Sequence, residues 1–154
     1  MTTMACIQEF LGQRRLALVG VSHAPNDFSR ALFREFQRRG YDVVPVNPAA
    51  REIEGQTCYA TVADVQPPVA AVLVMTPPAA TEAVVRDCAA AGVQRVWMFR
   101  GGGKGAVSRE AVGFCESKGI AVVAGECPFM FLPATGWIHR VHGWLRRLGR
   151  SYPR

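Results

Sequence analysis

A glycine and a serine near the start of the chain have the residue types and spacing that phosphate binding needs. Gly20 falls within an apolar run, Leu16 to Val21, and Ser22 follows it two residues later. A glycine at the end of a strand lets the backbone turn tightly, and a serine offers a hydroxyl and an amide to a phosphate near the start of the next helix. We therefore take Gly20, Val21 and Ser22, with Ser29 at the far end of the same polar loop, as candidate binding residues.

Two further turns follow apolar runs of the same kind. One is Val46-Asn47-Pro48, which ends the run from Asp42, and the other is Met75-Thr76-Pro77, which ends the run from Val69. In an open parallel sheet a ligand binds beyond the carboxyl ends of the strands, where the strand order reverses. The three turns are therefore expected to meet at one site.

The common nucleotide signatures are missing from these turns. In a G-x-G-x-x-G motif that begins at Gly20, Ser22 and Pro25 stand where the second and third glycines belong. The second strand ends in Asn47-Pro48 and offers no acidic residue to a ribose hydroxyl, which makes ordinary NAD binding a poor fit. The glycine-rich segment 101–105 lacks the Walker spacing and has no Ser or Thr after Lys104, so it is interpreted as a surface connection.

No catalytic constellation emerges from the reactive side chains. Ser22, His23 and Asp27 are neighbours in one loop, which rarely gives the geometry of a hydrolase triad, and no G-x-S-x-G elbow is present. His139 and His142 are three residues apart, but a zinc site needs further ligands that cannot be placed. The sequence predicts neither an enzyme nor a metal site.

The pattern that must position the three turns is an alternation of strands and helices. Short apolar runs read as inner parallel strands, and each is followed by a stretch with helical spacing that a glycine closes. This pattern predicts an α/β Rossmann-like fold of three layers, with about five parallel strands covered by helices on both faces. The expected strands are 16–21, 42–46, 69–75, 93–99 and 120–124, and the expected helices are 4–11, 31–40, 81–91 and 107–118.

Composition agrees with a globular protein. The chain has 154 residues, of which 49% are apolar, and no apolar stretch approaches the length that spans a bilayer. The start of the chain lacks a signal-peptide pattern, so a cytoplasmic location is the default expectation. The five cysteines are odd in number and scattered without a C-x-x-C pair, and they are interpreted as reduced thiols.

The net charge of +6 would suit an anionic partner, and much of it falls in the last 21 residues. Residues 137–148 carry an apolar stripe at helical spacing with arginines elsewhere, which predicts an amphipathic C-terminal helix. Such a stripe usually docks on its own domain or on a second subunit, and a basic, Trp-containing helix would also suit a membrane surface or an acidic partner. A homodimer or a protein partner through this helix is therefore an open expectation, and no nucleic acid is expected.

Six short segments, in chain order, resemble a known family. The chain looks like the small coenzyme A-binding proteins related to the nucleotide-binding domain at the start of the succinyl-CoA synthetase α subunit, and the resemblance covers roughly residues 10–133. The matching segments are Leu18-Val19-Gly20-Val21-Ser22, Gly40-Tyr41-Asp42-Val43-Val44-Pro45-Val46-Asn47-Pro48, Glu52-Ile53-Glu54-Gly55, Cys58-Tyr59, Val96-Trp97 and Glu126-Cys127-Pro128.

The resemblance implies coenzyme A, or an acyl-CoA, as the ligand. In that family the first glycine loop approaches the phosphates, the V-N-P turn lines the adenosine side and the T-P-P turn approaches the pantetheine. Carried over to this chain, these roles fall on Gly20-Val21-Ser22, on Val46-Asn47-Pro48, and on Thr76 and Pro77.

Two arginines are candidates for pairing with a phosphate of the ligand. Many relatives carry a lysine directly after the N-P pair, whereas this chain has Ala49 there and Arg51 two residues further on. Arg51 or Arg30 has the reach and the fork of donors to neutralise a phosphate, and each is equally compatible with a solvated surface position.

The resemblance implies binding and not a reaction, because the synthetase reaction needs a phosphorylated histidine that lies outside this domain. The expected function is non-catalytic binding of coenzyme A by one module, residues 1–154 with a core at 10–133 and a basic tail at 134–154. The alternatives are a nucleotide-regulated interaction protein that acts through the tail, and an NAD(P)-dependent enzyme, which the missing glycines and acidic residue disfavour.

Overall fold

A sheet of five parallel strands runs through the centre of the protein. The computed structural model describes residues 2–103 and 105–133. Its strands are β1 (Arg15–Val19), β2 (Asp42–Val46), β5 (Ala71–Val74), β6 (Arg95–Phe99) and β7 (Ala121–Glu126), and they lie in the order β2-β1-β5-β6-β7. Every pair in this sheet is parallel, which confirms the predicted topology.

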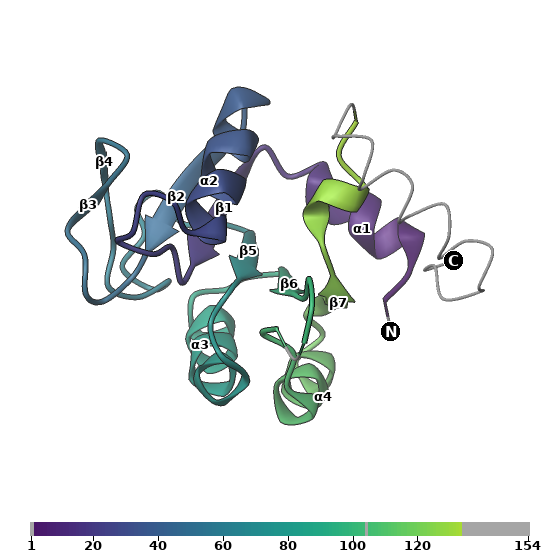
Figure 1. The fold of residues 1–154 in the computed structure, drawn as a ribbon. Coiled ribbons are helices and arrows are strands. Elements are labelled where there is room, and N and C mark those ends of the chain that lie inside the picture. The colour runs from purple at the N-terminus through teal and green to yellow at the C-terminus, as the bar shows by residue number, and fades with distance from the viewer. Residues whose placement is uncertain (1, 104, 134–154) are drawn as a thin grey trace.

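Helices cover both faces of the sheet and give the three predicted layers. Helices α1 (Met4–Leu11) and α2 (Phe28–Arg38) lie on one face, and α3 (Pro78–Ala90) and α4 (Arg109–Ser117) lie on the other (Figure 1). Each face has its own buried apolar cluster, and alternate residues of one strand belong to different clusters. The strands are therefore buried on both faces, which is why they appear in the sequence as continuous apolar runs.

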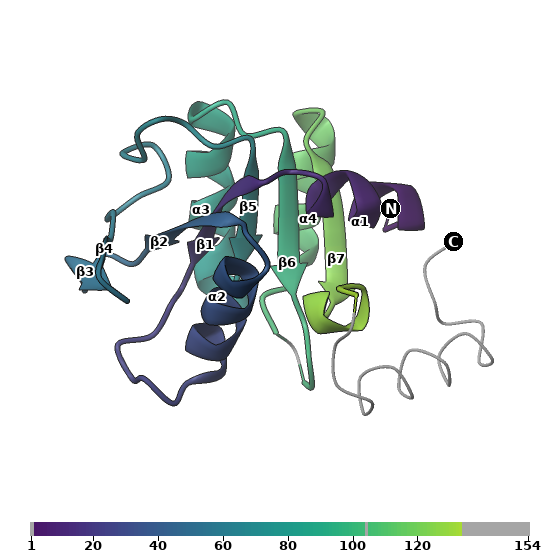
Figure 2. The ribbon, with the colours of Figure 1, turned by 90° about the horizontal axis from the view of Figure 1, so that it is seen from above.

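Helices α2 and α3 each begin three residues before the sequence pattern predicts. Asp27 caps α2 by accepting a hydrogen bond from the amide of Ser29, so the helix starts at Phe28. Helix α3 starts at Pro78, because a proline suits the first helical position, where its missing N–H has no intrahelical partner. Both helices begin at the carboxyl edge of the sheet (Figure 2).

One small element was not predicted. Strands β3 (Glu52–Ile53) and β4 (Gln56–Thr57) form an antiparallel hairpin where the sequence indicated only a polar loop. Its two turn residues, Glu54 and Gly55, both have positive φ, of 51° and 74°, as a two-residue hairpin turn requires. The propensity signal was weak because each strand has only two residues.

A short 3-10 helix, η1 (Pro128–Met130), follows β7. Just before it, the indole of Trp97 donates to the carbonyl of Glu126 at 3.0 Å in the interior, which joins two of the segments on which the family resemblance rests. Among the described helices, none is long and apolar enough to cross a membrane. The predicted C-terminal helix, with His139 and His142, lies outside the described residues.

Candidate functional site

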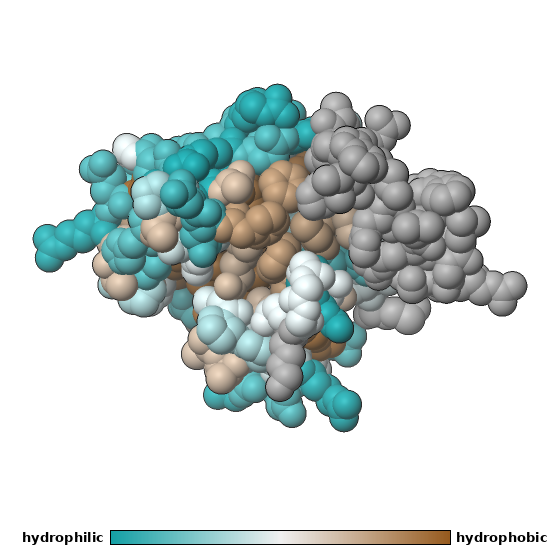
Figure 3. All heavy atoms as spheres, in the orientation of Figure 1, coloured by the Kyte–Doolittle hydropathy of each residue, from teal (hydrophilic) through white to brown (hydrophobic). Residues whose placement is uncertain are grey.

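The candidate site lies where the strand order reverses, at the carboxyl ends of β1 and β5. The chain leaves β1 toward β2 on one side and later returns as β5 on the other, which creates the crevice that parallel sheets use for ligands. Figure 3 faces this edge and shows apolar residues at the centre of the surface. The turns that begin at Gly20, Asn47 and Thr76 all lie here, as the sequence predicts.

Gly20 is packed closely against the end of β5. Its φ is +92°, and a Cβ atom on it would lie 3.1 Å from the carbonyl carbon of Met75 and 3.2 Å from the amide nitrogen of Thr76. Both neighbours are backbone atoms of the next strand end and cannot move aside as a side chain would. A residue other than glycine is therefore strained here both by its backbone conformation and by the lack of space.

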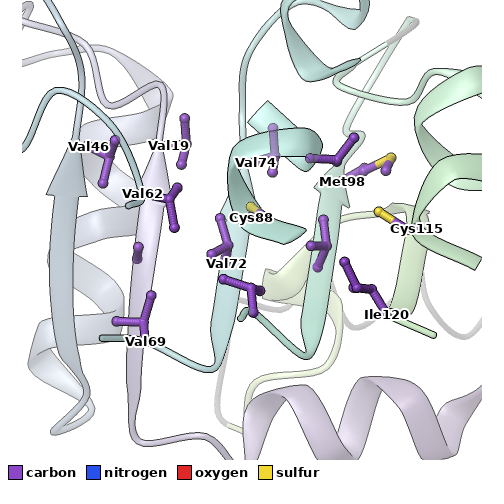
Figure 4. Close-up of a cluster of buried hydrophobic side chains, with 14 of the residues drawn as sticks. Val19, Val46, Val62, Val69, Val72, Val74, Cys88, Met98, Cys115 and Ile120 are labelled. Atoms are coloured by element: carbon purple, nitrogen blue, oxygen red, sulfur yellow. The ribbon is translucent and has the colours of Figure 1, made fainter. Parts of the chain in front are cut away.

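An apolar pocket of about 540 Å³ opens from Gly20 toward α3, and we call it the α3 pocket. This volume lies within the range of ligand pockets, roughly 300–1,000 Å³. Val19, Val46 and Val62 lie close together beside it (Figure 4). Asp87 is one of its few polar residues, and its Oδ2 accepts a hydrogen bond from the Val62 amide at 2.6 Å. The complete lining is Val19, Gly20, Val46, Asn47, Pro48, Ala60, Thr61, Val62, Thr76, Ala80, Ala83, Val84 and Asp87.

A second pocket, of about 470 Å³, lies on the other side of Gly20 beside the start of α2, and we call it the α2 pocket. Gly20 and Thr76 line both pockets, so the two are neighbours across the sheet edge. A long, narrow ligand can therefore run from one face of the sheet to the other. The lining is Gly20, Ser22, Asp27, Phe28, Ser29, Met75, Thr76, Pro77, Pro78, Phe99 and Gly105.

Asn47 ties the first two predicted turns together. Its side-chain amide donates to the carbonyl of Val21 at 2.7 Å, and its Oδ1 accepts from the amide of Ala49 at 2.9 Å. Val21 is fully buried and lines neither pocket, so its part in the site is to receive this bond. Asn47 is thus a positioning residue as well as part of the pocket wall.

The start of α2 already holds a negative charge. The amide of Ser22 donates to Ser29 Oγ at 2.9 Å, and Ser29 Oγ donates to Asp27 Oδ1 at 2.5 Å. The sequence predicts that the Ser22 amide and the start of α2 bind a phosphate. A phosphate there would compete with this existing chain of hydrogen bonds, which ends in the Asp27 carboxylate. Helix α3 offers a different start, because Pro77 at its N-cap makes no side-chain capping bond. We call the place where the two pockets meet, at Gly20 and Thr76, the neck. An anion at the neck meets the positive end of the α3 dipole without a competing carboxylate cap.

Arg30 is a clamp on the glycine loop and not a free cation. Its guanidinium donates to Glu54 Oε1 at 2.9 and 2.6 Å and to the carbonyls of Ser22 and His23 at 3.2 Å each. Arg34 donates to the same carboxylate oxygen at 2.8 Å. Hydrogen bonds from these two arginines lower the pKa of Glu54. Of the two predicted phosphate partners, Arg30 is therefore committed elsewhere.

Arg51 remains available, but at a distance from the pockets. Its side chain is exposed just after the Asn47-Pro48 turn, and it lines neither pocket. Its carbonyl accepts from the amide of Cys58 at 2.9 Å, which fixes the backbone on which the side chain is mounted.

The described residues contain no assembled catalytic group at this edge. Asp27 binds Ser29, and no hydrogen bond joins it to His23 in the part of the chain that the structure describes. Burial raises the pKa of the Cys127 thiol, which makes it less reactive. No cluster of three or more His, Cys, Asp or Glu side chains within residues 2–103 and 105–133 could hold a metal ion.

Sequence reasoning missed the residues of α3 that line the site. Ala80, Ala83, Val84 and Asp87 are spaced as i, i+3, i+4 and i+7, so they share one helix face. That face reads in the sequence as an ordinary amphipathic stripe. The signal that was available is the small size of its first residues, which leaves space above the sheet.

Comparison with known proteins agrees with this geometry. The family model described as CoA binding domain matches residues 14–133. The uncharacterized protein YneT of Bacillus subtilis (strain 168) is 26% identical over 122 residues, which are 79% of this chain and 87% of that protein. A conserved hypothetical protein from Pyrococcus furiosus is 32% identical with a TM-score of 0.68, over 74% of this chain and 95% of its own.

A larger enzyme contains a similar domain. The dinucleotide-forming acetyl-coenzyme A synthetase 1 of Ca. Korarchaeum cryptofilum is 30% identical with a TM-score of 0.64, and the match covers 73% of this chain but only 25% of that one. The family match covers most of the described residues and includes all three turns of the site. The chain therefore belongs to the CoA binding domain family.

Proposed function

We propose that this protein binds coenzyme A as a stand-alone module and does not itself catalyse a reaction. The observation that carries the proposal is the pair of pockets that share Gly20 and Thr76, in a chain whose family is described as a CoA binding domain. Coenzyme A is long, with an adenosine at one end, phosphates in the middle and a thiol-bearing arm at the other. Two pockets joined by a narrow polar neck match that division.

The adenosine belongs in the α3 pocket. Its walls are mainly valine and alanine, which suit the faces of a purine ring. Asp87 lines the pocket and uses Oδ2 for the Val62 amide, and a carboxylate has further acceptor capacity for an exocyclic amine of the ligand. The Val46-Asn47-Pro48 turn forms the edge of the same pocket, in the role that the family resemblance assigns to it.

The phosphates belong at the neck and the pantetheine in the α2 pocket. At the neck the missing side chain of Gly20 lets the glycine loop lie against the Met75-Thr76 backbone, and the uncapped start of α3 favours negative charge. Thr76 and Pro77 then lead into the α2 pocket, together with Ser22 and Ser29. Arg51 at the rim contributes a longer-range attraction to a phosphate.

Calorimetric titration with coenzyme A tests the proposal, with NAD as the competing ligand. We expect saturable binding of coenzyme A and none of NAD. Ala80→Phe should fill the mouth of the α3 pocket and weaken coenzyme A binding by about tenfold or more, because a bulky ring takes the space of the ligand. Ala79→Phe is the matched control, since Ala79 is exposed on the same helix and lines neither pocket.

Both substitutions are at exposed positions, so each should change the free energy of unfolding by no more than about 0.5 kcal/mol. Absence of coenzyme A binding to the natural chain would contradict the proposed function. Unchanged affinity in Ala80→Phe would contradict the placement of the adenosine.

A further inference from the structure

Three phenylalanines from distant parts of the chain meet beside the α2 pocket, and two of them line it. Phe28 begins α2, Phe99 ends β6 and Phe129 lies in η1, and we call them the phenylalanine cluster. The ring centroids of Phe28 and Phe99 are 5.3 Å apart, and those of Phe28 and Phe129 are 5.6 Å apart. These distances are typical of aromatic packing.

Phe28 is exposed although it has aromatic partners. It is the one exposed large apolar side chain among the described residues, at 41%. An apolar ring left in water forgoes the stabilisation that burial would give, and Phe28 lines a pocket in which a ligand could cover it.

The cluster continues the path of the proposed ligand. Phe28 and Phe99 line the α2 pocket with Met75, Pro77 and Pro78, and that pocket adjoins the α3 pocket at Gly20 and Thr76. If the adenosine fills the α3 pocket, the thiol end of coenzyme A points out through the α2 pocket. Any acyl group on the sulfur then meets the phenylalanine cluster.

The charges at the pocket select the kind of acyl group. Asp27 is on its lining, next to Phe28, and the described lining residues include no lysine or arginine. A carboxylate on the acyl group would be repelled by Asp27, whereas an alkyl chain would cover apolar rings.

We propose that the phenylalanine cluster is an acyl subsite and that the natural ligand is an acyl-CoA with a neutral, apolar acyl group. This inference rests on the proposed coenzyme A function. An alkyl chain on the sulfur adds apolar contacts with the cluster beyond those that free coenzyme A makes. Burial of several methylene groups is expected to raise the affinity by about tenfold or more over coenzyme A.

The test is calorimetric titration of the full chain with coenzyme A, hexanoyl-CoA and succinyl-CoA under identical conditions. We expect hexanoyl-CoA to bind about tenfold or more tightly than coenzyme A, and succinyl-CoA to gain no such advantage. Phe28→Ala should abolish the hexanoyl preference, because it weakens hexanoyl-CoA binding more than coenzyme A binding, while Phe28→Leu should keep most of the preference. Phe114→Ala is the control, because Phe114 lies on α4 and lines neither pocket.

The outcomes separate the two proposals. If coenzyme A itself does not bind, the proposed function fails. If coenzyme A binds but hexanoyl-CoA binds no more tightly, or succinyl-CoA binds as tightly as hexanoyl-CoA, the acyl subsite is wrong and the function stands. Light scattering measures the oligomeric state alongside the titration. If the natural chain is a dimer without acyl preference, and Phe28→Ala dissociates that dimer, the cluster is an interface between two copies and the acyl subsite is wrong.

Discussion

Replacing Asp27 with asparagine should make the protein bind coenzyme A more tightly. Asp27 accepts from the amide of Ser29 at 2.8 Å and from its hydroxyl at 2.5 Å, at the rim of the α2 pocket. Asparagine caps a helix about as well as aspartate, so Asp27→Asn removes a charge and keeps the cap. The fold should remain as stable as in the natural chain.

The size of the effect follows from the distance between the two charges. Gly20 at the neck and Asp27 line the same pocket, so we take a separation of roughly 6 Å between a phosphate at the neck and the Asp27 carboxylate. Two unit charges at that distance repel by about 0.7 kcal/mol in water. Removing this repulsion from a pyrophosphate should tighten binding by about three- to tenfold at low ionic strength.

Calorimetric titration with coenzyme A at low and at physiological ionic strength measures the effect. Salt should reduce the gain to roughly half its free energy, because the screening length at physiological ionic strength is about 8 Å. Asp42→Asn is the control, since Asp42 begins β2 at the opposite edge of the sheet and carries the same charge. Equal or weaker binding by Asp27→Asn at low ionic strength, with an unchanged melting temperature, would refute the placement of the phosphates at the neck, next to the α2 pocket.

Three further substitutions test the frame of the site. Gly20→Ala should lower the free energy of unfolding by about 1–3 kcal/mol in urea titration, because φ is +92° and the new Cβ meets backbone; an unaltered midpoint would mean that the loop relaxes freely. Asn47→Ala should lower the free energy of unfolding by about 1–3 kcal/mol in the same assay and should weaken coenzyme A binding, because the Val21 carbonyl loses its donor. Unchanged stability together with unchanged affinity would contradict the role of this hydrogen bond. The pKa of Glu35 is lowered from its ordinary 4.5 to about 2, first by its hydrogen bond from Arg38, so its contribution to stability exists above pH 4.5 and disappears as the pH falls toward 2. Glu35→Gln should therefore lower the free energy of unfolding at pH 7 by about 0.5–1 kcal/mol. In urea titrations at a series of pH values, the difference in free energy of unfolding between the natural chain and the variant should shrink as the pH falls; a pH-independent difference would contradict the ion pair.

The sheet and the three turns could be predicted from the sequence because local patterns encode them. Each inner strand is a short apolar run, and its end is marked by a glycine or proline, as at Gly20, Pro48 and Pro77. Burial on both faces requires that continuous apolar pattern, so the pattern and the fold express the same constraint.

The rest of the site depends on contacts between distant residues. The phenylalanine cluster joins Phe28, Phe99 and Phe129, whose sequence neighbours give no sign that their rings meet. Arg30 looked like a free cation because its partner Glu54 lies 24 residues away, on a hairpin too short to predict. Pairing of this kind arises only when the topology has brought the segments together.

The ion pairs of Arg30 and Arg34 with Glu54 affect the rate and the affinity with which the candidate site would bind a ligand. Because Arg30 and Arg34 anchor the loop after Gly20 to helix α2 and to the hairpin, the loop is ordered when the chain folds. The conformational entropy of the loop is then lost before any ligand arrives, so association does not bear that cost. A ligand meets a shape that is already formed, and its rate of capture is set by diffusion and charge rather than by a slow rearrangement of the chain.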